Sequence, residues 1–196
     1  MDEMRSWDAL PVKKLAASGE VSAQFIALGT NDFRSTARYV HQLPYGRNAD
    51  RADFRLVLRE RRGTCSTKHA LLAALAIEQQ LPVRLTLGIY EMDERNTPGV
   101  GAVLETYAMA FMPEAHCYLT YDGLRIDVTR EVASPKESIA RFLHEETIAP
   151  VQIGDYKVGM HQRWMQDWVR RAMPNRDWKD VWKIREECIA ALSEPR

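Results

Sequence analysis

The sequence has few cysteines, no long hydrophobic run and no excess of charge of either sign. Three cysteines, an odd number without the spacing of a disulfide framework, favour a reducing, cytoplasmic location over secretion. Lys plus Arg and Asp plus Glu both number 27, which argues against broad electrostatic capture of nucleic acid or of an acidic membrane. No apolar stretch is long enough to span a bilayer, and the start has no signal-peptide pattern.

The chain has enough hydrophobic residues to bury a large core. Hydrophobic residues make up 45% and charged residues 28% of its 196 residues, as is ordinary for a globular protein. We expect a core domain over residues 1–150 and a helical extension over 151–196. Two tryptophan pairs at i, i+4 spacing, Trp164 with Trp168 and Trp178 with Trp182, would pack that extension on the core. There it would cover or gate a cleft.

The most informative stretch runs from Arg61 to Ile77. An alanine- and leucine-rich run over 70–77 predicts a helix buried nearly all round, with Thr64 as its N-cap. Cys65 would then lie at the positive end of the helix dipole, which favours the thiolate that a nucleophile needs. The alternative is that Cys65 is a small buried hydrophobic residue, as most free cysteines are.

Capping, breaker and alternation signals predict the neighbouring elements. In chain order these are a short helix over 11–17, a helix capped by Asn31, a short helix over 54–58 and a strand over 83–90. Thr97-Pro98 is a possible helix start, and residues 100–112 fit either a helix or a strand.

The clearest local structure is a hairpin over residues 115–129 with a two-residue turn at Asp122-Gly123. Its register pairs 121 with 124 and 119 with 126, so one face is almost wholly apolar. On the other face His116 and Asp127 are diagonal neighbours, within reach of an imidazole–carboxylate contact. Such a carboxylate orients the ring and stabilises its charged form. The alternative is a polar, solvent-facing surface with an incidental His and Asp.

Taken together, these motifs resemble the transglutaminase-like superfamily of cysteine enzymes. The resemblance covers residues 31–130 and depends on the order of the motifs. They stand here as Leu43-Pro44-Tyr45, Gly63-Thr64-Cys65, Leu81-Pro82-Val83-Arg84, Gly88-Ile89-Tyr90, His116-Cys117-Tyr118 and Asp127-Val128-Thr129. Tyr118 stands where the family usually has tryptophan, and Val128 where it has proline.

The resemblance implies an α+β, papain-like fold in which the nucleophile helix packs on an antiparallel sheet. It also implies a triad of Cys65 as nucleophile, His116 as general base and acid, and Asp127 as orienter. The reaction would be hydrolysis or acyl transfer at an amide bond of a peptide or protein through a thioester, with hydrolysis favoured over cross-linking. Substrate or oxyanion groups would come from four further residues, namely Tyr45, Thr64, His69 and Tyr118.

Several alternatives remain open at this stage. An arylamine acetyltransferase shares the triad, but its chain is usually longer and no nucleotide-cofactor signature is present. A zinc site from Cys65, His69, His116 and Cys117 is disfavoured because adjacent strand residues point to opposite faces, so we expect neither metal nor cofactor. His69, four residues after Cys65, either tunes the thiolate or is a buried helix histidine. The competing class of function is a non-catalytic peptide- or partner-binding module that retains the fold.

Overall fold

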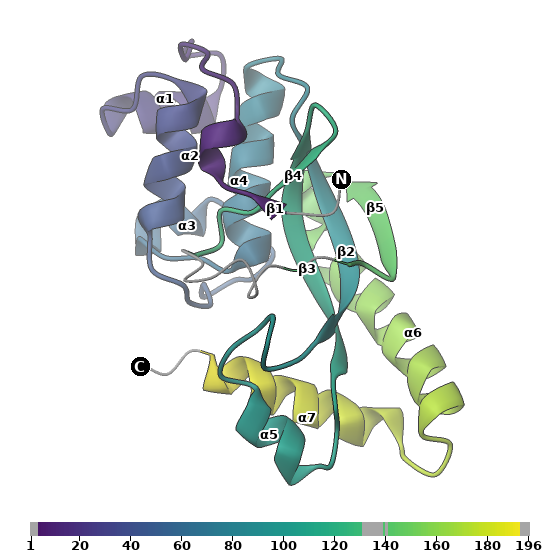
Figure 1. The fold of residues 1–196 in the computed structure, drawn as a ribbon. Coiled ribbons are helices and arrows are strands. Elements are labelled where there is room, and N and C mark those ends of the chain that lie inside the picture. Colours follow the sequence, from purple (N-terminus) through teal and green to yellow (C-terminus); the bar gives the residue numbers. More distant parts are fainter. Residues whose placement is uncertain (1–3, 131–138, 140, 193–196) are drawn as a thin grey trace.

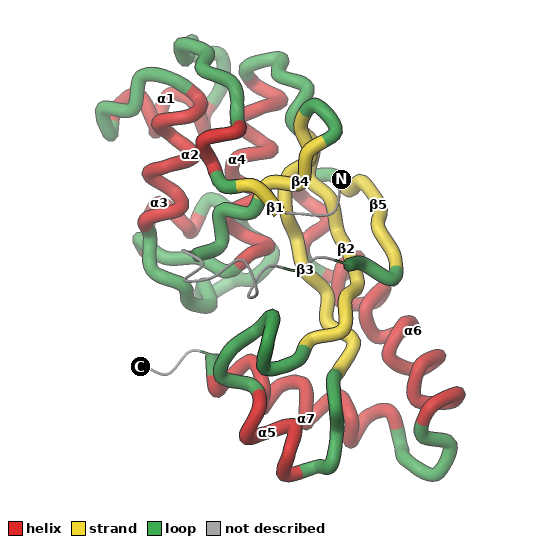
Figure 2. The backbone as a smooth tube through the Cα atoms, viewed as in Figure 1, coloured by secondary structure: helices red, strands yellow, loops and turns green. Residues whose placement is uncertain are grey.

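The computed structural model describes residues 4–130, 139 and 141–192, and within them the fold is α+β. A five-stranded sheet has the order β1-β4-β3-β2-β5 (Figures 1 and 2). Its strands are β1 (Met4–Arg5), β2 (Arg84–Met92), β3 (Met112–Tyr121), β4 (Leu124–Ile126) and β5 (His144–Ile148). Every pairing is antiparallel except that of the two-residue β1 with β4. The expected α+β class and antiparallel sheet are thus confirmed.

The helices form two groups, one packed against the sheet through α4 and one around the far end of β2 and β3 (Figure 1). The first group is α1 (Glu20–Ala27), α2 (Phe33–Gln42), α3 (Leu56–Glu60) and α4 (Cys65–Glu78), and the second is α5 (Gly101–Thr106), α6 (Asp155–Ala172) and α7 (Trp178–Ala191). In the described part of the chain, the 3-10 turns η1 (Trp7–Ala9) and η3 (Pro150–Ile153) lie between strands and helices. None of the described helices is both long and apolar enough to cross a membrane.

Helix α4 is buried on almost every side, as its alanine and leucine content predicts. Leu71, Leu72 and Leu75 are at most 1% exposed and share one hydrophobic cluster with Leu85 and Leu119 of the sheet. The apolar face predicted for the hairpin is therefore the face on which α4 packs. The predicted register is also observed: Leu119 pairs with Ile126 and Tyr121 with Leu124. Asp122 and Gly123 both have positive φ, as this tight turn requires.

A second hydrophobic cluster surrounds the far end of the β2–β3 ribbon. It joins Met92 and Met112 of the strands to Leu104 of α5, Met165 of α6 and Val181 of α7. The tryptophans Trp168, Trp178 and Trp182 pack against this cluster, whereas Trp164 packs against the first. Residues after 150 therefore share their core with residues 90–112, which the sequence analysis assigned to the first domain.

The N-terminal predictions need two corrections. Residues 11–17 are not helical, and the first α-helix begins at Glu20 because the Glu78 carboxylate accepts hydrogen bonds from the amides of Val21 and Ser22 at 2.9 and 2.7 Å. The cap of α2 is Asp32 rather than Asn31, with Asp32 Oδ1 accepting from the Ser35 N–H at 2.9 Å.

Two further predictions concern the middle of the chain. The short helix expected near 54–58 is α3, and the predicted strand at 83–90 is β2. Residues 100–112 contain α5 and then the start of β3. Val100 precedes α5 as its N-cap, while the Thr97 hydroxyl lies 2.9 Å from that of Tyr90.

A buried lysine ties the first turns of α4 to two other segments. The Lys68 side chain is fully buried, and its Nζ donates to the carbonyls of Leu43 at 2.5 Å, Thr129 at 2.8 Å and His41 at 3.4 Å. Three acceptors match the three protons of an ammonium. Burial lowers the Lys68 pKa to about 8, so the cation predominates at neutral pH.

Replacing this lysine is expected to destabilise the fold. Lys68→Met keeps the apolar stem but leaves buried carbonyls without a donor, and it should lower the free energy of unfolding by about 2–4 kcal/mol. Urea denaturation followed by circular dichroism measures the change. Lys183→Met, at an exposed lysine of α7, is the matched control and should change stability by no more than about 0.5 kcal/mol. Equal stabilities of the two variants would contradict the role given to Lys68.

Candidate active site

Cys65 is the first residue of α4 and is partly exposed. Thr64 occupies the predicted N-cap position, and its N–H donates to the Thr67 hydroxyl at 3.0 Å. Gly63 makes this entry possible, because a Cβ there would lie 2.9–3.0 Å from side-chain atoms of Thr67, Lys68 and Val57. As the first helical residue, Cys65 has an N–H without an intrahelical acceptor.

The segment at Tyr45 is held beside the start of α4 by a short parallel bridge. The Gly63 N–H donates to the Pro44 carbonyl, and the Gly46 N–H donates to the Gly63 carbonyl, both at 3.2 Å. Tyr45 thereby lines the same cavity as Cys65. Burial and the negative charge of Cys65 raise the pKa of Tyr45 well above its ordinary value. The phenol therefore keeps its proton and remains a hydrogen-bond donor.

His116 and Asp127 lie within hydrogen-bonding distance, as predicted, although the second strand of the hairpin ends at Ile126 and not at residue 129. His116 Nε2 is 2.7 Å from Asp127 Oδ2, and Asp127 Oδ1 accepts from the Thr129 N–H at 2.7 Å. Because β4 ends at Ile126, Asp127 follows the last paired residue and is free to turn toward His116. Nε2 is occupied by Asp127, so Nδ1 is the nitrogen left to serve Cys65.

The charges of these three residues stabilise one another. Burial alone would raise the pKa of the Cys65 thiol, but the positive charges of His116 and Lys157 and a hydrogen bond from His116 lower it to about 6. Burial would lower the pKa of His116, but the charges of Asp127 and Cys65 raise it to about 10. Burial likewise opposes ionisation of Asp127, yet His116 holds its pKa well below the usual range. At neutral pH the site is a thiolate–imidazolium–carboxylate array.

His69 connects the backbone of Cys65 to the segment that carries Asp127. Its Nδ1 lies 2.7 Å from the Cys65 carbonyl, and its Nε2 accepts from the Val128 N–H at 2.8 Å. Burial lowers the pKa of His69 to about 4, so the ring is neutral and its 3.5 Å approach to Asp127 is not an ion pair. Of the two roles considered for His69, the structure places it as a fully buried helix histidine.

The partly exposed Cys65 faces a cavity of about 510 Å³ between the start of α4 and the C-terminal helices. This volume lies in the range of small-molecule and side-chain pockets. Its wall contains Tyr45 and Thr64 from the first half of the chain, and Lys157, His161 and Arg185 from α6 and α7. Of the three predicted triad residues only Cys65 lines it. The C-terminal helices thus form one side of the cleft.

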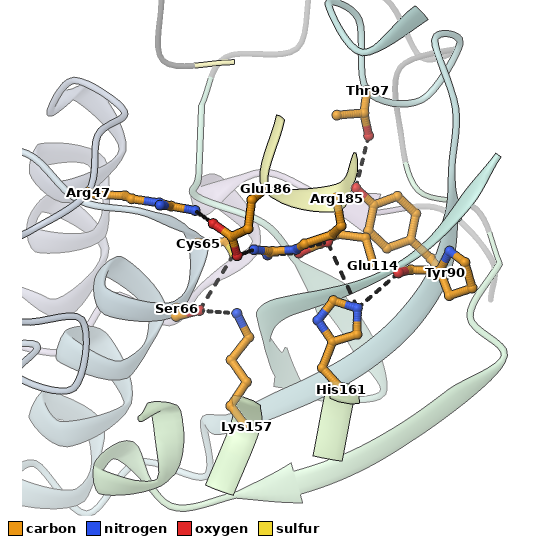
Figure 3. A network of polar contacts seen from close by, with 11 residues as sticks. Arg47, Cys65, Ser66, Tyr90, Thr97, Glu114, Lys157, His161, Arg185 and Glu186 are labelled. Atoms are coloured by element: carbon orange, nitrogen blue, oxygen red, sulfur yellow. Dashed lines mark hydrogen bonds and ion pairs between the residues drawn. The ribbon is translucent and has the colours of Figure 1, made fainter. Parts of the chain in front are cut away.

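A buried ion pair fixes α7 against the sheet at this cavity. Arg185 Nη2 and Nε lie 2.5 and 2.7 Å from the two carboxylate oxygens of Glu114 on β3. Burial opposes ionisation of Glu114, but the charge of Arg185 lowers the carboxyl pKa to about 2. His161 Nε2 lies 2.9 Å from the Pro113 carbonyl, and burial lowers its pKa. Figure 3 shows these side chains converging from α6, α7 and β3.

Lys157 of α6 brings a cation close to the nucleophile. Its Nζ donates to the Ser66 hydroxyl at 2.7 Å, and that hydroxyl lies 3.8 Å from the Cys65 sulfur (Figure 3). The sequence analysis did not identify Lys157, Arg185 or Glu114. The only local signal is the i, i+4 spacing of Lys157 and His161, which puts both on one helical face.

Tyr118 lies on the face of β3 that carries His116, but away from the cavity. Its hydroxyl donates to Glu145, and its ring stacks on Phe142 at a centroid distance of 4.9 Å. Tyr118 is fully buried, so the face of β3 expected to be polar is covered as well. Among the residues suggested for substrate or oxyanion contacts, Tyr45 and Thr64 line the cavity, whereas His69 and Tyr118 do not.

Comparisons with family models, curated proteins and solved structures find no match to this chain. The site is therefore interpreted from its own geometry. Within the described residues, no three His, Cys, Asp or Glu side chains are grouped as metal ligands would be. The chemistry that the arrangement can perform follows from an ionised thiol and a phenol that line one cavity, with a charged imidazole behind the thiol.

The lowered pKa of Cys65 gives an expected pH profile for its alkylation. Thiolate forms as the pH rises through the pKa, so labelling by iodoacetamide should reach half its maximum near pH 6. In His116→Gln the burial of the thiol is no longer offset by the imidazolium, and the midpoint should move to about 8.5 or higher. Mass spectrometry of the Cys65 peptide over time gives the rates.

The matched control is His144→Gln, which removes a partly exposed histidine whose ring packs on Trp164. Its profile should coincide with that of the unaltered protein. A midpoint near 8.5 in the unaltered protein, or one that His116→Gln does not move, would rule out the thiolate–imidazolium pair.

Proposed function

We propose that this protein is a cysteine-dependent amide hydrolase or acyltransferase of the transglutaminase-like type, with a papain-like core. The observation that supports this most directly is the His116–Asp127 contact beside a cysteine at a helix start. The proposed substrate is a peptide or protein amide, and the free cysteines suit a reducing cytoplasm.

In the proposed reaction, the Cys65 thiolate attacks the carbonyl carbon of the amide and forms a C–S bond. The carbonyl electron pair moves to oxygen, where the Cys65 N–H and the Tyr45 hydroxyl donate to the oxyanion. As the tetrahedral intermediate collapses, the C–N bond breaks and His116 gives its Nδ1 proton to the leaving amine. The products of this half-reaction are a thioester on Cys65, a neutral His116 and a free amine.

The second half-reaction releases the acyl group. Neutral His116 takes a proton from water, or from an acceptor amine, as that nucleophile adds to the thioester carbonyl. The C–S bond then breaks and restores the thiolate, while Asp127 stabilises the imidazolium that forms. Asp127 keeps its charge throughout, because both of its oxygens already accept hydrogen bonds.

The test is turnover of p-nitrophenyl esters and peptide p-nitroanilides, with intact-mass detection of acyl-Cys65. Cys65→Ala should abolish both the adduct and turnover, and Asp127→Asn should lower turnover by about 10²–10⁴-fold. Tyr45→Phe should lower turnover by about 10–10³-fold without shifting the pH profile of alkylation, because it removes an oxyanion donor and not a charge.

Cys188→Ala is the matched cysteine control, since Cys188 belongs to the second hydrophobic cluster and does not line the cavity. It should retain turnover. A stoichiometric adduct without repeated turnover on any of these substrates would favour the competing interpretation, a binding module that retains the fold.

A further inference from the structure

The cationic side chains around the cavity outnumber the carboxylates. Four cations line it, namely Arg47, Arg51, Lys157 and Arg185, against the two carboxylates of Glu114 and Glu186. The Cys65 thiolate adds a third negative charge to the wall, whereas His116 and Asp127, whose charges balance each other, do not line it. The wall of the cavity is therefore left with an excess of positive charge, even though the whole chain is neutral.

Two of the cations are already paired. Arg185 binds Glu114 through two nitrogens, and a third nitrogen lies 2.7 Å from Glu186. Arg47 also contacts Glu186, at 2.7 Å. These ion pairs hold α7 against β3 and the loop after α2, and they leave no unbalanced charge of their own.

The other two cations have no carboxylate partner among the described residues. Lys157 has one hydrogen bond, to the neutral Ser66 hydroxyl, so two of its three protons remain available. Arg51 is exposed and has no hydrogen bond or ion pair with any described side chain. The first turn of α4 faces the same space through Thr64, Cys65, Ser66 and Thr67, and its amides favour an anion there.

We propose that this cavity binds a carboxylate carried by the substrate close to the bond that Cys65 attacks, with Lys157 as the anchoring cation and Arg51 as a second one. The inference rests on the proposed function for the identity of Cys65 as the reacting group. It adds the substrate class: acyl compounds with a free carboxylate, either the terminal carboxylate of a peptide or an acidic side chain.

The test compares two reagents that differ only in charge. Iodoacetate and iodoacetamide alkylate the same sulfur, and the ratio of their rates on Cys65 does not depend on the fraction of thiolate. Relative to the same ratio on N-acetylcysteine, the unaltered protein should favour iodoacetate by about tenfold. Lys157→Gln should reduce this preference to within about twofold of the free thiol, and Lys157→Arg should restore most of it.

Arg163→Gln is the matched control, because Arg163 is an exposed cation of the same helix outside the cavity lining. It should leave the ratio unchanged, and Arg51→Gln should lower it. An unchanged ratio in Lys157→Gln, with the protein folded by circular dichroism, would overturn the proposal.

A second pair of reagents separates the two sources of the carboxylate. Bromoacetyl-glycine against its amide tests a terminal carboxylate, and bromoacetyl-aspartate amide against the asparagine analogue tests a side chain. Preference for the acid in at least one pair, lost in Lys157→Gln, supports the site, and preference in neither overturns it. Alkylation needs only a thiolate, so absence of turnover would refute the proposed function and leave this result standing.

Discussion

Two hydrogen bonds of the His69 ring connect the backbone of the nucleophile, Cys65, to the segment that carries Asp127. One ring nitrogen meets the carbonyl of Cys65 itself, and the other accepts from the N–H of Val128, next to Asp127. The ring is fully buried, so no water competes for these bonds. A protonated ring would point an N–H at the N–H of Val128, and burial prevents this by keeping His69 neutral. The charge of Asp127 is therefore directed to His116 rather than to His69.

The contacts of Asp127 lie where β4, the strand next to the edge strand β1, ends. β4 contributes only three residues, and at Ile126 the chain leaves the ladder. Asp127 lies just beyond the last paired residue and accepts from both His116 and the Thr129 N–H. Lys68 supports this departure, because it binds the Thr129 carbonyl from within α4. Lys68 and His69, which lie in one turn of α4, thus both bind the backbone that follows Asp127.

Local signals in the sequence were sufficient for the elements that carry the site. Thr64 at the N-cap, the buried helix α4, the Asp122-Gly123 turn and the pairing of His116 with Asp127 all follow from capping, composition and strand alternation. Apart from the cap of α2, where Asp32 takes the place expected of its neighbour Asn31, errors arose where a distant residue decides the local structure. Residues 11–17 remain non-helical while Gln79 exchanges hydrogen bonds with both backbone groups of Ala16. Neither that contact nor the capping of α1 by Glu78 can be recognised from the residues that surround these positions in the sequence.

The charged half of the cavity could not be predicted for the same reason. Glu114 on β3 and Arg185 on α7 are 71 residues apart in sequence, and Lys157 and Ser66 are 91 apart. In the sequence, Glu114, Lys157 and Arg185 look like ordinary surface charges. Only the second hydrophobic cluster, which brings α6 and α7 against the β2–β3 ribbon, places them together. The tryptophans of these helices pack as expected, and the helices also place Lys157, Arg185 and Glu186 in the wall of the cavity.

The Glu114–Arg185 pair shows why those helices matter to Cys65. A buried ion pair of this kind adds little net stability, because the desolvation of both charges offsets their attraction. Its effect on the site is larger. Glu114 lies two residues before His116 on the same face of β3 and lines the cavity that Cys65 faces. An unpaired carboxylate there would oppose the thiolate, whereas Arg185 neutralises it and leaves the positive charges of His116 and Lys157 to act on the sulfur. The C-terminal helices thereby help to set the ionisation state of a cysteine more than eighty residues earlier in the chain.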